Sequence, residues 1–550
     1  MKGRSTNPAV GSDSDEALET TRDSLRVAVW TAVSRISGLV RVMVIAAVLG
    51  PTFLGNTYQF ANSVPNLVYY GLLGGSLVSS LLVPAFVRHL SAGRPDVAAA
   101  LARDLFGCAV CAAAVAVPLI IVVVPLALRL TSGGDAHEAH AQVGAATWLI
   151  VLLAPQIVCY AVVACAVAVM NAHRRFALAA AAPLIENLGS IAVLVLVWTR
   201  YGSGREVTAV GGGEIALLGV GTTAAVLLHA AVQWYGARRC GVTLVPRFGW
   251  RNPQVRVVAK RGAAAAAQAG LWAVQLLVAL ALSNRFAGGV VAVLIASNFL
   301  FLPIALVATP IALSTLPRLA AHHVEGRREA YAAATARALR LTVFVAAPAG
   351  VGYLVLAGPL ARAVTFGTAA ASDARTLVTW SLGGLALGVI GLALCTVATY
   401  AHYARDEVLV PLRSTLVQAG VAIAVMSCSL AVPGGAALAV ICVGLAAGAL
   451  VGATLQVWQL RLGRTLMQEF FRSAARTAVC ALVMGGASWA CVHTFASSAS
   501  RLAQLGSLAL AVLVGAVVYF AGQRVARAPE LTLLAGSLGI HRRAPQAATP

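Results

Sequence analysis

The sequence predicts an all-α polytopic membrane protein with fourteen transmembrane helices, and three observations lead to that prediction. The chain has 550 residues, of which 59% are hydrophobic and only 11% charged, whereas a soluble domain carries about 25% charged residues. Apolar runs of about 20 residues, the length that crosses a bilayer, recur along the chain. Lys and Arg gather in every second loop between these runs, which is the pattern of alternating cytoplasmic and outward loops.

The apolar runs place the spans in order along the chain. They lie near residues 26–49, 57–87, 105–128, 142–170, 177–199, 214–237, 262–284, 288–317, 341–361, 376–402, 409–431, 436–460, 477–496 and 504–523. A miscounted span would reverse the bias in basic residues for every later loop, and no reversal occurs. We therefore expect both termini in the cytoplasm. The formal charge of +21 is mainly a topology signal, and no nucleic-acid partner is expected.

The tails and loops are too short to hold a folded catalytic domain. Residues 1–25 are polar and mixed in charge and predict a disordered cytoplasmic tail, and residues 524–550 form a second cytoplasmic tail. No loop carries a carboxylate pair or a nucleotide-binding motif. Cys108 and Cys111 form a CxxC inside an apolar run without a second pair, so we expect buried thiols and no metal site. The chain is predicted to be a transporter rather than an enzyme.

The first span contains two arginines in the stretch "VSRISGLVRVMV". A charge near the centre of a membrane helix costs roughly 2.5–3.5 kcal/mol on insertion scales. At about 100° per residue, Arg35 and Arg41 share one polar sector with Ser34, Ser37 and Gly38. The stripe predicts a water-accessible cavity that binds an anion, with Gly38 leaving room for a ligand. The alternative, that both arginines reach opposite membrane surfaces, is disfavoured because they lie only about 9 Å apart along the axis.

One acidic residue and one histidine also lie well inside spans. Glu186, in "PLIENLGS", is the one acidic residue well within an apolar run. It either pairs with an arginine or carries a coupling proton, and the sequence leaves both interpretations open. His229, in "LLHAAVQW", is interpreted as a helix contact rather than a proton relay.

Proline spacing predicts bent helices at corresponding positions of two halves. Pro65 and Pro84 bracket a Gly/Ser-rich segment in the second span. Pro303, Pro310 and Pro317 follow one another at seven-residue spacing in the eighth span. Interrupted helices at matching places in two repeats are typical of a two-lobed transporter, so Pro65, Pro84, Pro303 and Pro310 are candidate hinges.

The stretch from Ser34 to Pro84, with "SRISGLVR", "VPNLV" and "LVPAF", resembles the opening of the MurJ/MviN family of lipid II flippases. This family belongs to the multidrug/oligosaccharidyl-lipid/polysaccharide exporter superfamily. In "MNAHRRFALAAAAPLIENL" the residues Asn171, Arg175, Phe176, Pro183 and Asn187 match the family's N…RF…P…N pattern. The resemblance continues through "VTLVPRF", "VRVVAKRG", "LPIALVATPIALSTLPRLA", "VTFGTAAASDA" and "YARDEVLVP", and so covers nearly the whole chain.

The resemblance implies two six-helix lobes in a V around a central cationic cavity, followed by two further helices. On this chain the lobes would be residues 26–237 and 262–460, joined by a cytoplasmic linker at 238–261, with the last two helices at 461–523. The implied function is to move lipid II, a polyprenyl-diphosphate-linked peptidoglycan precursor, across the bacterial cytoplasmic membrane by alternating access. The implied partners are this lipid and proteins of cell-wall synthesis and cell shape. No cofactor is expected, and membrane potential, sodium and protons stay open as the driving force.

The chain also departs from the family pattern at several cavity positions. Arg35 and Arg41 match two first-helix arginines of the family, but Asn56 stands at an acidic position and Tyr69 and Tyr70 replace an arginine pair. An acidic-Gly step becomes Gly74-Gly75, and an Asp-Arg pair with a downstream Glu becomes Ser297, Asn298 and Phe301. We interpret Asn56, Tyr69, Tyr70 and Asn298 as candidate substrate-binding residues beside Ser34, Arg35, Gly38 and Arg41.

These departures keep two other functions open. Two arginines and Glu186 leave one net positive charge, whereas a diphosphate carries about two negative charges. A paralogue that exports another glycolipid or an amphiphilic specialised metabolite is therefore the first alternative. A non-transporting scaffold for cell-wall enzymes is the second, although the short loops offer partners little surface.

Overall fold

The computed structural model describes residues 9–69, 83–370, 372–495 and 500–532. Every regular element in these residues is a helix. The contacts divide the chain into two compact units, Met1–Val291 and Ala292–Pro550. We describe each unit by itself.

Unit 1 contains the first ten α-helices of the chain. They are α1 (Ala9–Leu49), α2 (Phe53–Val68), α3 (Val83–Ser91), α4 (Pro95–Thr131), α5 (Ala136–Leu153), α6 (Gln156–Ala172), α7 (Phe176–Ala181), α8 (Pro183–Tyr201), α9 (Gly212–Arg239) and α10 (Pro253–Ser283).

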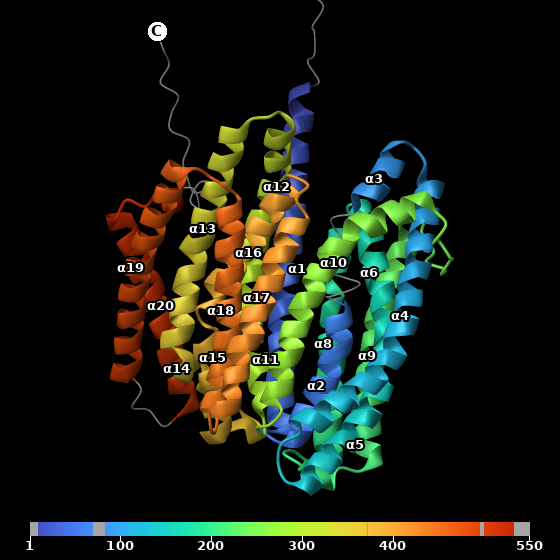
Figure 1. The fold of residues 1–550 in the computed structure, drawn as a ribbon, viewed down its shortest axis with the longest axis vertical. Helices are drawn as coiled ribbons and strands as arrows, with labels where there is room; N and C mark the ends of the chain where they lie inside the picture. Colours follow the sequence, from blue (N-terminus) through green and yellow to red (C-terminus); the bar gives the residue numbers. More distant parts are fainter. Residues whose placement is uncertain (1–8, 70–82, 371, 496–499, 533–550) are drawn as a thin grey trace, which may run out of the picture. The chain divides into compact units, whose positions relative to one another are not determined.

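In unit 1, α1 packs on α8, α8 packs on α9, and α9 packs on α6 (Figure 1). The core of this packing includes Ile45 of α1, Leu54 of α2 and Leu149 of α5, all of which are buried. Helix α2 begins with a side-chain cap, because Thr52 Oγ1 accepts a hydrogen bond of 3.2 Å from the backbone N–H of Gly55. This arrangement brings polar residues of α1, α6, α8 and α9 close together inside an apolar bundle.

Unit 2 contains most of α11 and all the helices that follow. They are α11 (Gly289–Pro303), α12 (Thr309–Val324), α13 (Arg328–Val355), α14 (Ala357–Val364), α15 (Ser372–Leu385), α16 (Gly388–Tyr403), α17 (Leu409–Ser427), α18 (Ala436–Gln459), α19 (Arg464–Phe495) and α20 (Arg501–Val525). Residues Ile304–Ala308 form a π-helical segment between α11 and α12.

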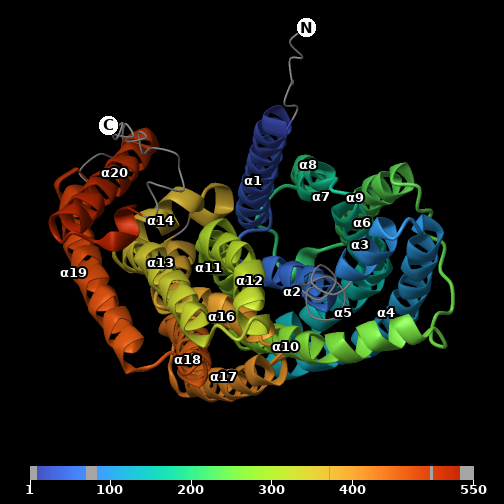
Figure 2. The same cartoon turned by 90° about the horizontal axis from the view of Figure 1, so that it is seen from above.

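Each helix from α12 to α20 packs against at least one other helix of unit 2. Helix α18 contacts both α16 and α17, while α19 contacts both α13 and α20 (Figure 2). Glu530, just after α20, is buried and pairs with Arg476 of α19. The same carboxylate accepts a hydrogen bond of 2.8 Å from Ser473 Oγ. The end of the described chain is therefore held against α19 by a charged contact.

The described helices agree with the predicted all-α membrane fold. Twelve of them are long and apolar enough to cross a membrane, and a thirteenth span is formed if Asp373–Leu385 and Gly388–Tyr403, which are bent by 44°, count as one. The remaining predicted span, near 57–87, includes residues that lie outside the described part of the chain. The count of fourteen therefore stays a prediction.

Two boundaries differ from those expected from the sequence. Helix α1 begins at Ala9, within the segment expected to be a disordered tail, and no Gly or Pro interrupts residues 12–37. The contact boundary at Val291 leaves the expected linker, 238–261, inside unit 1. Helix α10 joins unit 1 because it packs on α2 and α4. The division into transporter lobes and tails stays a prediction.

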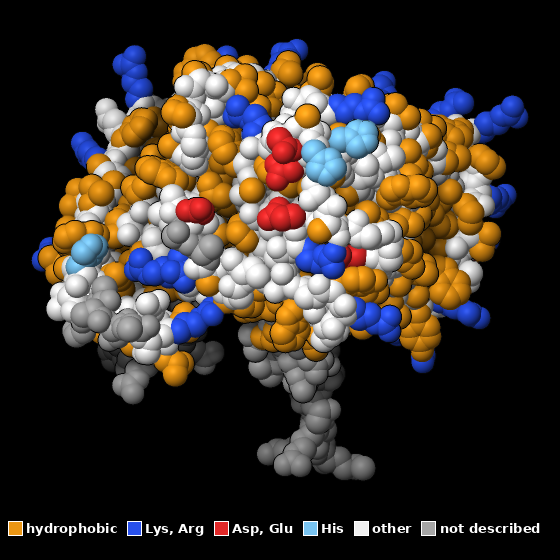
Figure 3. All heavy atoms as spheres, turned by 90° about the horizontal axis from the view of Figure 1, so that it is seen from below, with side chains coloured by type: hydrophobic (Ala, Val, Ile, Leu, Met, Phe, Trp, Pro, Cys, Tyr) orange, Lys and Arg blue, Asp and Glu red, His pale blue; other side chains and the backbone are white. Residues whose placement is uncertain are grey.

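Large hydrophobic side chains are exposed on many helices, as expected for surfaces that face lipid. Examples are Leu119 of α4, Leu227 of α9 and Leu482 of α19. Figure 3, which looks along the helices from below, shows charged side chains among the hydrophobic ones at this end of the molecule. These exposed residues agree with a bundle whose solvent is the bilayer.

Candidate substrate site

An ion pair joins α1 to α8 in unit 1. Arg41 Nη1 lies 3.1 Å from Glu186 Oε1, and the two side chains are 17% and 9% exposed. Glu186 lies in the first turn of α8, where a negative charge interacts favourably with the helix dipole. The structure shows Glu186 paired with an arginine, and its role in coupling stays a prediction.

Two further side chains complete the coordination of the Glu186 carboxylate. The hydroxyl of Tyr160, from α6, donates to Oε1 at 3.1 Å. Nδ1 of His229, from α9, lies 2.9 Å from Oε2. Four helices thus each supply one residue to what we call the Glu186 cluster: Arg41, Tyr160, Glu186 and His229. A buried carboxylate needs this number of donors to offset the loss of its hydration.

His229 has a polar neighbour at each ring nitrogen. Nδ1 lies 2.9 Å from Glu186 Oε2, and Nε2 lies 3.4 Å from Gln233 Nε2. Because a carboxylate only accepts hydrogen bonds, Nδ1 is the nitrogen that donates to Glu186.

Tyr69 is joined to the Glu186 cluster by an aromatic contact. Its ring stacks on that of Tyr160, with centroids 5.0 Å apart and planes at 28°. Tyr69 and Glu186 therefore both contact Tyr160, and a role of Tyr69 in substrate binding stays a prediction. Tyr70 lies outside the described residues.

Part of the polar stripe on α1 forms a helix contact. Asn187 Nδ2, from α8, donates to Ser37 Oγ at 2.8 Å and to the backbone carbonyl of Ser34 at 3.3 Å. A Cβ added to Gly38 would lie 3.6 Å from the same nitrogen. In this conformation Asn187 is therefore the group that lies next to Ser34, Ser37 and Gly38.

Arg35 differs from Arg41 in its surroundings. Its side chain is exposed, and it makes no ion pair with any side chain in the described part of the chain. One turn and a half along the same helix, Arg41 is half-buried and paired. Arg35 is thus the cation of this stripe that is available to an outside anion.

Asn56 occupies a structural position in unit 1. Its Nδ2 donates to the carbonyl of Phe286 at 2.7 Å, and its Oδ1 accepts from the backbone N–H of Val290 at 3.1 Å. The side chain is fully buried, so both ends of the amide hold the turn between α10 and α11. Its predicted contact with substrate stays a prediction.

The remaining predicted site residues are distributed over other helices. Asn298 Nδ2 donates to the carbonyl of Leu294 in its own helix, at 2.8 Å. Pro65 lies inside α2 and Pro84 inside α3. Pro303 ends α11, directly before the π-helical segment, and Pro310 lies in the first turn of α12. Hinge motion at these prolines stays a prediction, although a π-helical segment often marks a functional site in a helix.

Several residues of the site could not be singled out from the sequence. Tyr160 and Gln233 occur as isolated polar residues in apolar runs. The packing of α6 and α8 on α9 places Tyr160 beside Glu186, and Gln233 contacts His229 one turn away on α9. The sequence offers one general indication of Tyr160 and Gln233, because a polar side chain inside an apolar run needs a hydrogen-bond partner. Among the described residues, no three His, Cys, Asp or Glu side chains come together as metal ligands.

Known proteins resemble this chain in both sequence and fold. The family model "Lipid II flippase MurJ" matches residues 45–521, a range that begins after Arg35 and Arg41. A probable lipid II flippase MurJ from Rhizobium meliloti (strain 1021) is 26% identical over 510 residues, covering 89% of this chain and 90% of the relative. The lipid II flippase MurJ of Burkholderia cenocepacia is 25% identical over 407 residues, covering 71% of this chain and 75% of the relative.

Solved structures share the fold of the chain. A lipid II flippase MurJ in an inward closed conformation has a TM-score of 0.70 at 16% identity, covering 93% of this chain and 99% of that one. An inward-facing MATE transporter of the MOP superfamily has a TM-score of 0.61 at 14% identity, covering 78% and 94%. The family match extends over most of the chain, and its members are transporters rather than enzymes. The protein is a member of the MurJ family of lipid II flippases.

Proposed function

We propose that this protein moves lipid II from the inner to the outer leaflet of the cytoplasmic membrane by alternating access. The observation that carries the proposal is Arg35, an exposed arginine within a membrane-spanning helix that has no counter-charge among the described side chains. An unpaired cation at such a position needs an anionic ligand or water. A diphosphate head group supplies that anion, and arginine can bind its oxygens through two parallel hydrogen bonds.

The Glu186 cluster supports a second contact to the same head group. When Arg41 turns toward a phosphate, Glu186 keeps Tyr160 and His229 as hydrogen-bond donors. No buried carboxylate is then left without a partner, so the exchange avoids the full desolvation penalty. Ser34 and Gly38, on the same helix as the two arginines, and Tyr69, which stacks on Tyr160, complete the proposed substrate site.

The same exchange supports protons as the coupling ion, with sodium and the membrane potential as alternatives. Once Arg41 leaves Glu186, the carboxylate has lost its arginine counter-charge and still contacts His229. Uptake of one proton by this pair restores its charge balance. We expect transport by the wild type to depend on pH, and Glu186→Gln to remove that dependence. An unchanged pH profile in the variant would assign Glu186 a purely structural role.

The proposed function is tested by replacing the lipid II flippase of a depleted bacterial strain with this chain. We expect the wild type and Ile36→Ala, a change at an exposed neighbour on the same helix, to restore growth. Arg35→Ala should not restore growth at equal membrane levels. Failure of the wild type despite normal membrane levels would refute lipid II transport.

A second function, export of another glycolipid or an amphiphilic metabolite, is favoured by the composition of the site. Arg41 is neutralised by Glu186, and the aromatic pair Tyr69–Tyr160 lies beside it. Such a site suits a head group with less negative charge and a ring that can stack. Transport of a less acidic glycolipid by reconstituted protein that does not move lipid II would establish this alternative. A non-transporting scaffold is the third reading, and it requires that neither lipid moves.

The protein is a multi-pass membrane protein of the MurJ family. We propose that it lies in the bacterial cytoplasmic membrane with both termini in the cytoplasm, and that proteins of cell-wall synthesis are its partners. The distribution of Lys and Arg among the loops supports this orientation. Single cysteines introduced near each terminus of a variant without the ten native cysteines should not be labelled from outside intact cells.

A further inference from the structure

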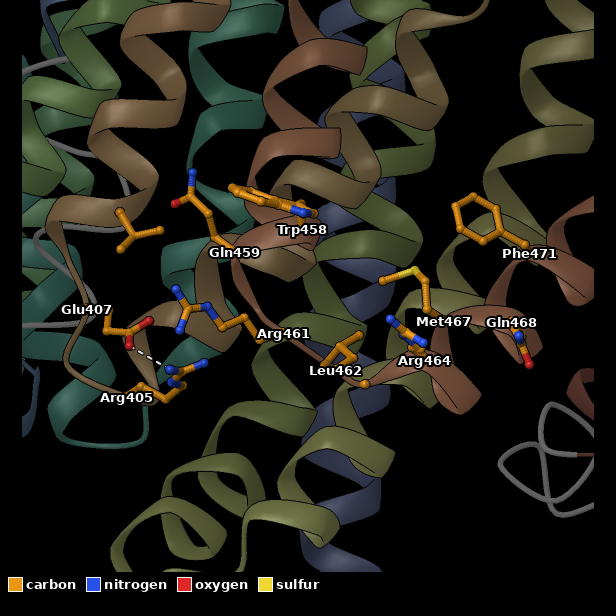
Figure 4. Close-up of a pocket in the computed structure, with 12 residues that line it drawn as sticks. Arg405, Glu407, Trp458, Gln459, Arg461, Leu462, Arg464, Met467, Gln468 and Phe471 are labelled. Atoms are coloured by element: carbon orange, nitrogen blue, oxygen red, sulfur yellow. Dashed lines mark ion pairs between the residues drawn. The ribbon is translucent and has the colours of Figure 1, made fainter.

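Unit 2 contains a cavity of about 960 Å³ where α18 ends and α19 begins. Its walls come from the connection between α16 and α17, from the last turn of α18 and from the first two turns of α19. Three arginines line it: Arg405, Arg461 and Arg464. Figure 4 shows these side chains around the same hollow, with Glu407 beside Arg405. We call it the Arg461 cavity.

The one carboxylate in the wall of the Arg461 cavity is already neutralised. Arg405 Nη2 lies 2.7 Å from Glu407 Oε1, and His402 Nδ1 lies 2.9 Å from Glu407 Oε2. His402 is fully buried, and its Nε2 lies 3.1 Å from the carbonyl of Gln456. Glu407 is thereby held at the edge of the cavity with a partner on each oxygen.

Arg461 and Arg464 are not neutralised in this way. Both are exposed, and neither forms an ion pair with a side chain in the described ranges. The short connection that carries them is anchored by Leu462, which is buried. Arg461 has a φ of +50°, a conformation that ordinarily favours glycine. Two cations are therefore fixed next to each other without a counter-charge.

The rim of the cavity is apolar and exposed. Trp458 and Phe471 are 73% and 63% exposed, and Met467 lies between them in the wall. Tryptophan at the end of a membrane-spanning helix is typical of the membrane–water interface. Basic side chains at that level interact with anionic lipid head groups. A ligand that matches this cavity has an anionic group joined to an apolar body.

We propose that the Arg461 cavity binds the phosphodiester head group of an anionic phospholipid in the leaflet at this end of the bundle. Arg461 and Arg464 contact the phosphate oxygens, and the ion pair between Arg405 and Glu407 keeps the carboxylate in the wall from repelling the phosphate. Trp458 and Phe471 pack against the glycerol and the first methylene groups of the acyl chains. The site is independent of the transported substrate, because all its residues belong to unit 2 and none belongs to the proposed substrate site.

The proposal is tested on the purified full-length chain in neutral detergent, by native mass spectrometry with added lipid. The probes are phosphatidylglycerol and phosphatidylcholine with identical acyl chains, so that only the head-group charge differs. We expect the wild type to bind phosphatidylglycerol preferentially. The double variant Arg461→Gln/Arg464→Gln should bind phosphatidylglycerol with an affinity that is lower by roughly tenfold or more. Arg472→Gln, which removes an exposed arginine of the same helix outside the cavity, should bind as the wild type does.

Three outcomes would overturn the proposal. The first is equal binding of phosphatidylglycerol by the wild type and the double variant. The second is equal binding of the two lipids by the wild type. The third is displacement of phosphatidylglycerol by millimolar inorganic phosphate, which would indicate a site for a free anion rather than a lipid. Because no lipid II is present, none of these results bears on the proposed transport.

Discussion

The Glu186 cluster of unit 1 and the Arg461 cavity of unit 2 handle positive charge in opposite ways. Arg41 is largely buried and shares a carboxylate with a tyrosine and a histidine. Arg461 and Arg464 are exposed, and the nearby carboxylate of Glu407 is occupied by other partners. The difference follows from hydration, since a buried charge needs a protein partner whereas an exposed one can use water or a ligand.

Arg35 resembles Arg461 and Arg464 in being exposed, although it lies on the same helix as Arg41. The comparison indicates that Arg41 contributes to holding α1 against α8, whereas Arg35 is free to bind. It also gives the following predictions for the free energy of unfolding, measured by denaturant titration in detergent micelles.

The largest effect is expected from Glu186→Gln. This change leaves the guanidinium of Arg41 buried without a counter-charge, and breaking a buried ion pair on one side costs about 3 kcal/mol or more. The double variant Arg41→Gln/Glu186→Gln removes both charges and should recover most of the lost stability. If Glu186→Gln were as stable as the wild type, water rather than Glu186 would be what solvates the charge of Arg41.

His402→Ala should have the next largest effect, because His402, which contacts Glu407 at the edge of the Arg461 cavity, is buried as well. The substitution removes the contacts of both ring nitrogens, to Glu407 and to the Gln456 carbonyl, and leaves a void. We expect a loss of about 2 kcal/mol. His323→Ala, at an exposed histidine of α12, is the matched control and should change stability by less than about 0.5 kcal/mol. Equal effects of the two changes would show that the contacts of His402 with Glu407 and the Gln456 carbonyl do not stabilise the fold.

Tyr160→Phe should cost about 1 kcal/mol, since it removes one hydrogen bond to Glu186 and keeps the ring that stacks on Tyr69. The same change made in the Glu186→Gln background should cost less, because the charged acceptor is already absent. Identical costs in the two backgrounds would show that the tyrosine hydroxyl does not interact with Glu186.

The smallest effect is expected from Arg461→Gln/Arg464→Gln. Exposed arginines without ion pairs contribute little to folding, so the free energy of unfolding should change by less than about 0.5 kcal/mol in neutral detergent. A loss well above that value would show that these arginines stabilise the fold and are not held for a ligand.

The sequence predicted the helical membrane fold well because hydrophobicity is a property of each segment. The spans near 105–128 and 436–460 correspond to Pro95–Thr131 and Ala436–Gln459. Boundaries were less accurate, and α1 extends further toward the N-terminus than expected. Helix propensity, rather than hydrophobicity, continues that helix through its polar residues.

The site was predicted only in part, because partners from distant segments cannot be read from local patterns. Arg41 and Glu186 were singled out as charges in apolar runs, and the structure brings them together. Tyr160 and Gln233 carry no charge and had no such signal. Asn56 was chosen for its place in the family pattern. In the structure its side-chain amide forms hydrogen bonds with the backbone of a turn more than two hundred residues away along the chain.

The π-helical segment at Ile304–Ala308 changes how the eighth span should be read. In an uninterrupted α-helix, residues seven apart lie on nearly the same side, so Pro303, Pro310 and Pro317 would form one line along it. Hydrogen bonds from residue i to i+5 make a wider turn, and everything after it is rotated relative to what comes before. Pro310 and Pro317 therefore follow one line and Pro303 another, so a substrate or a neighbouring helix meets α11 and α12 as two surfaces.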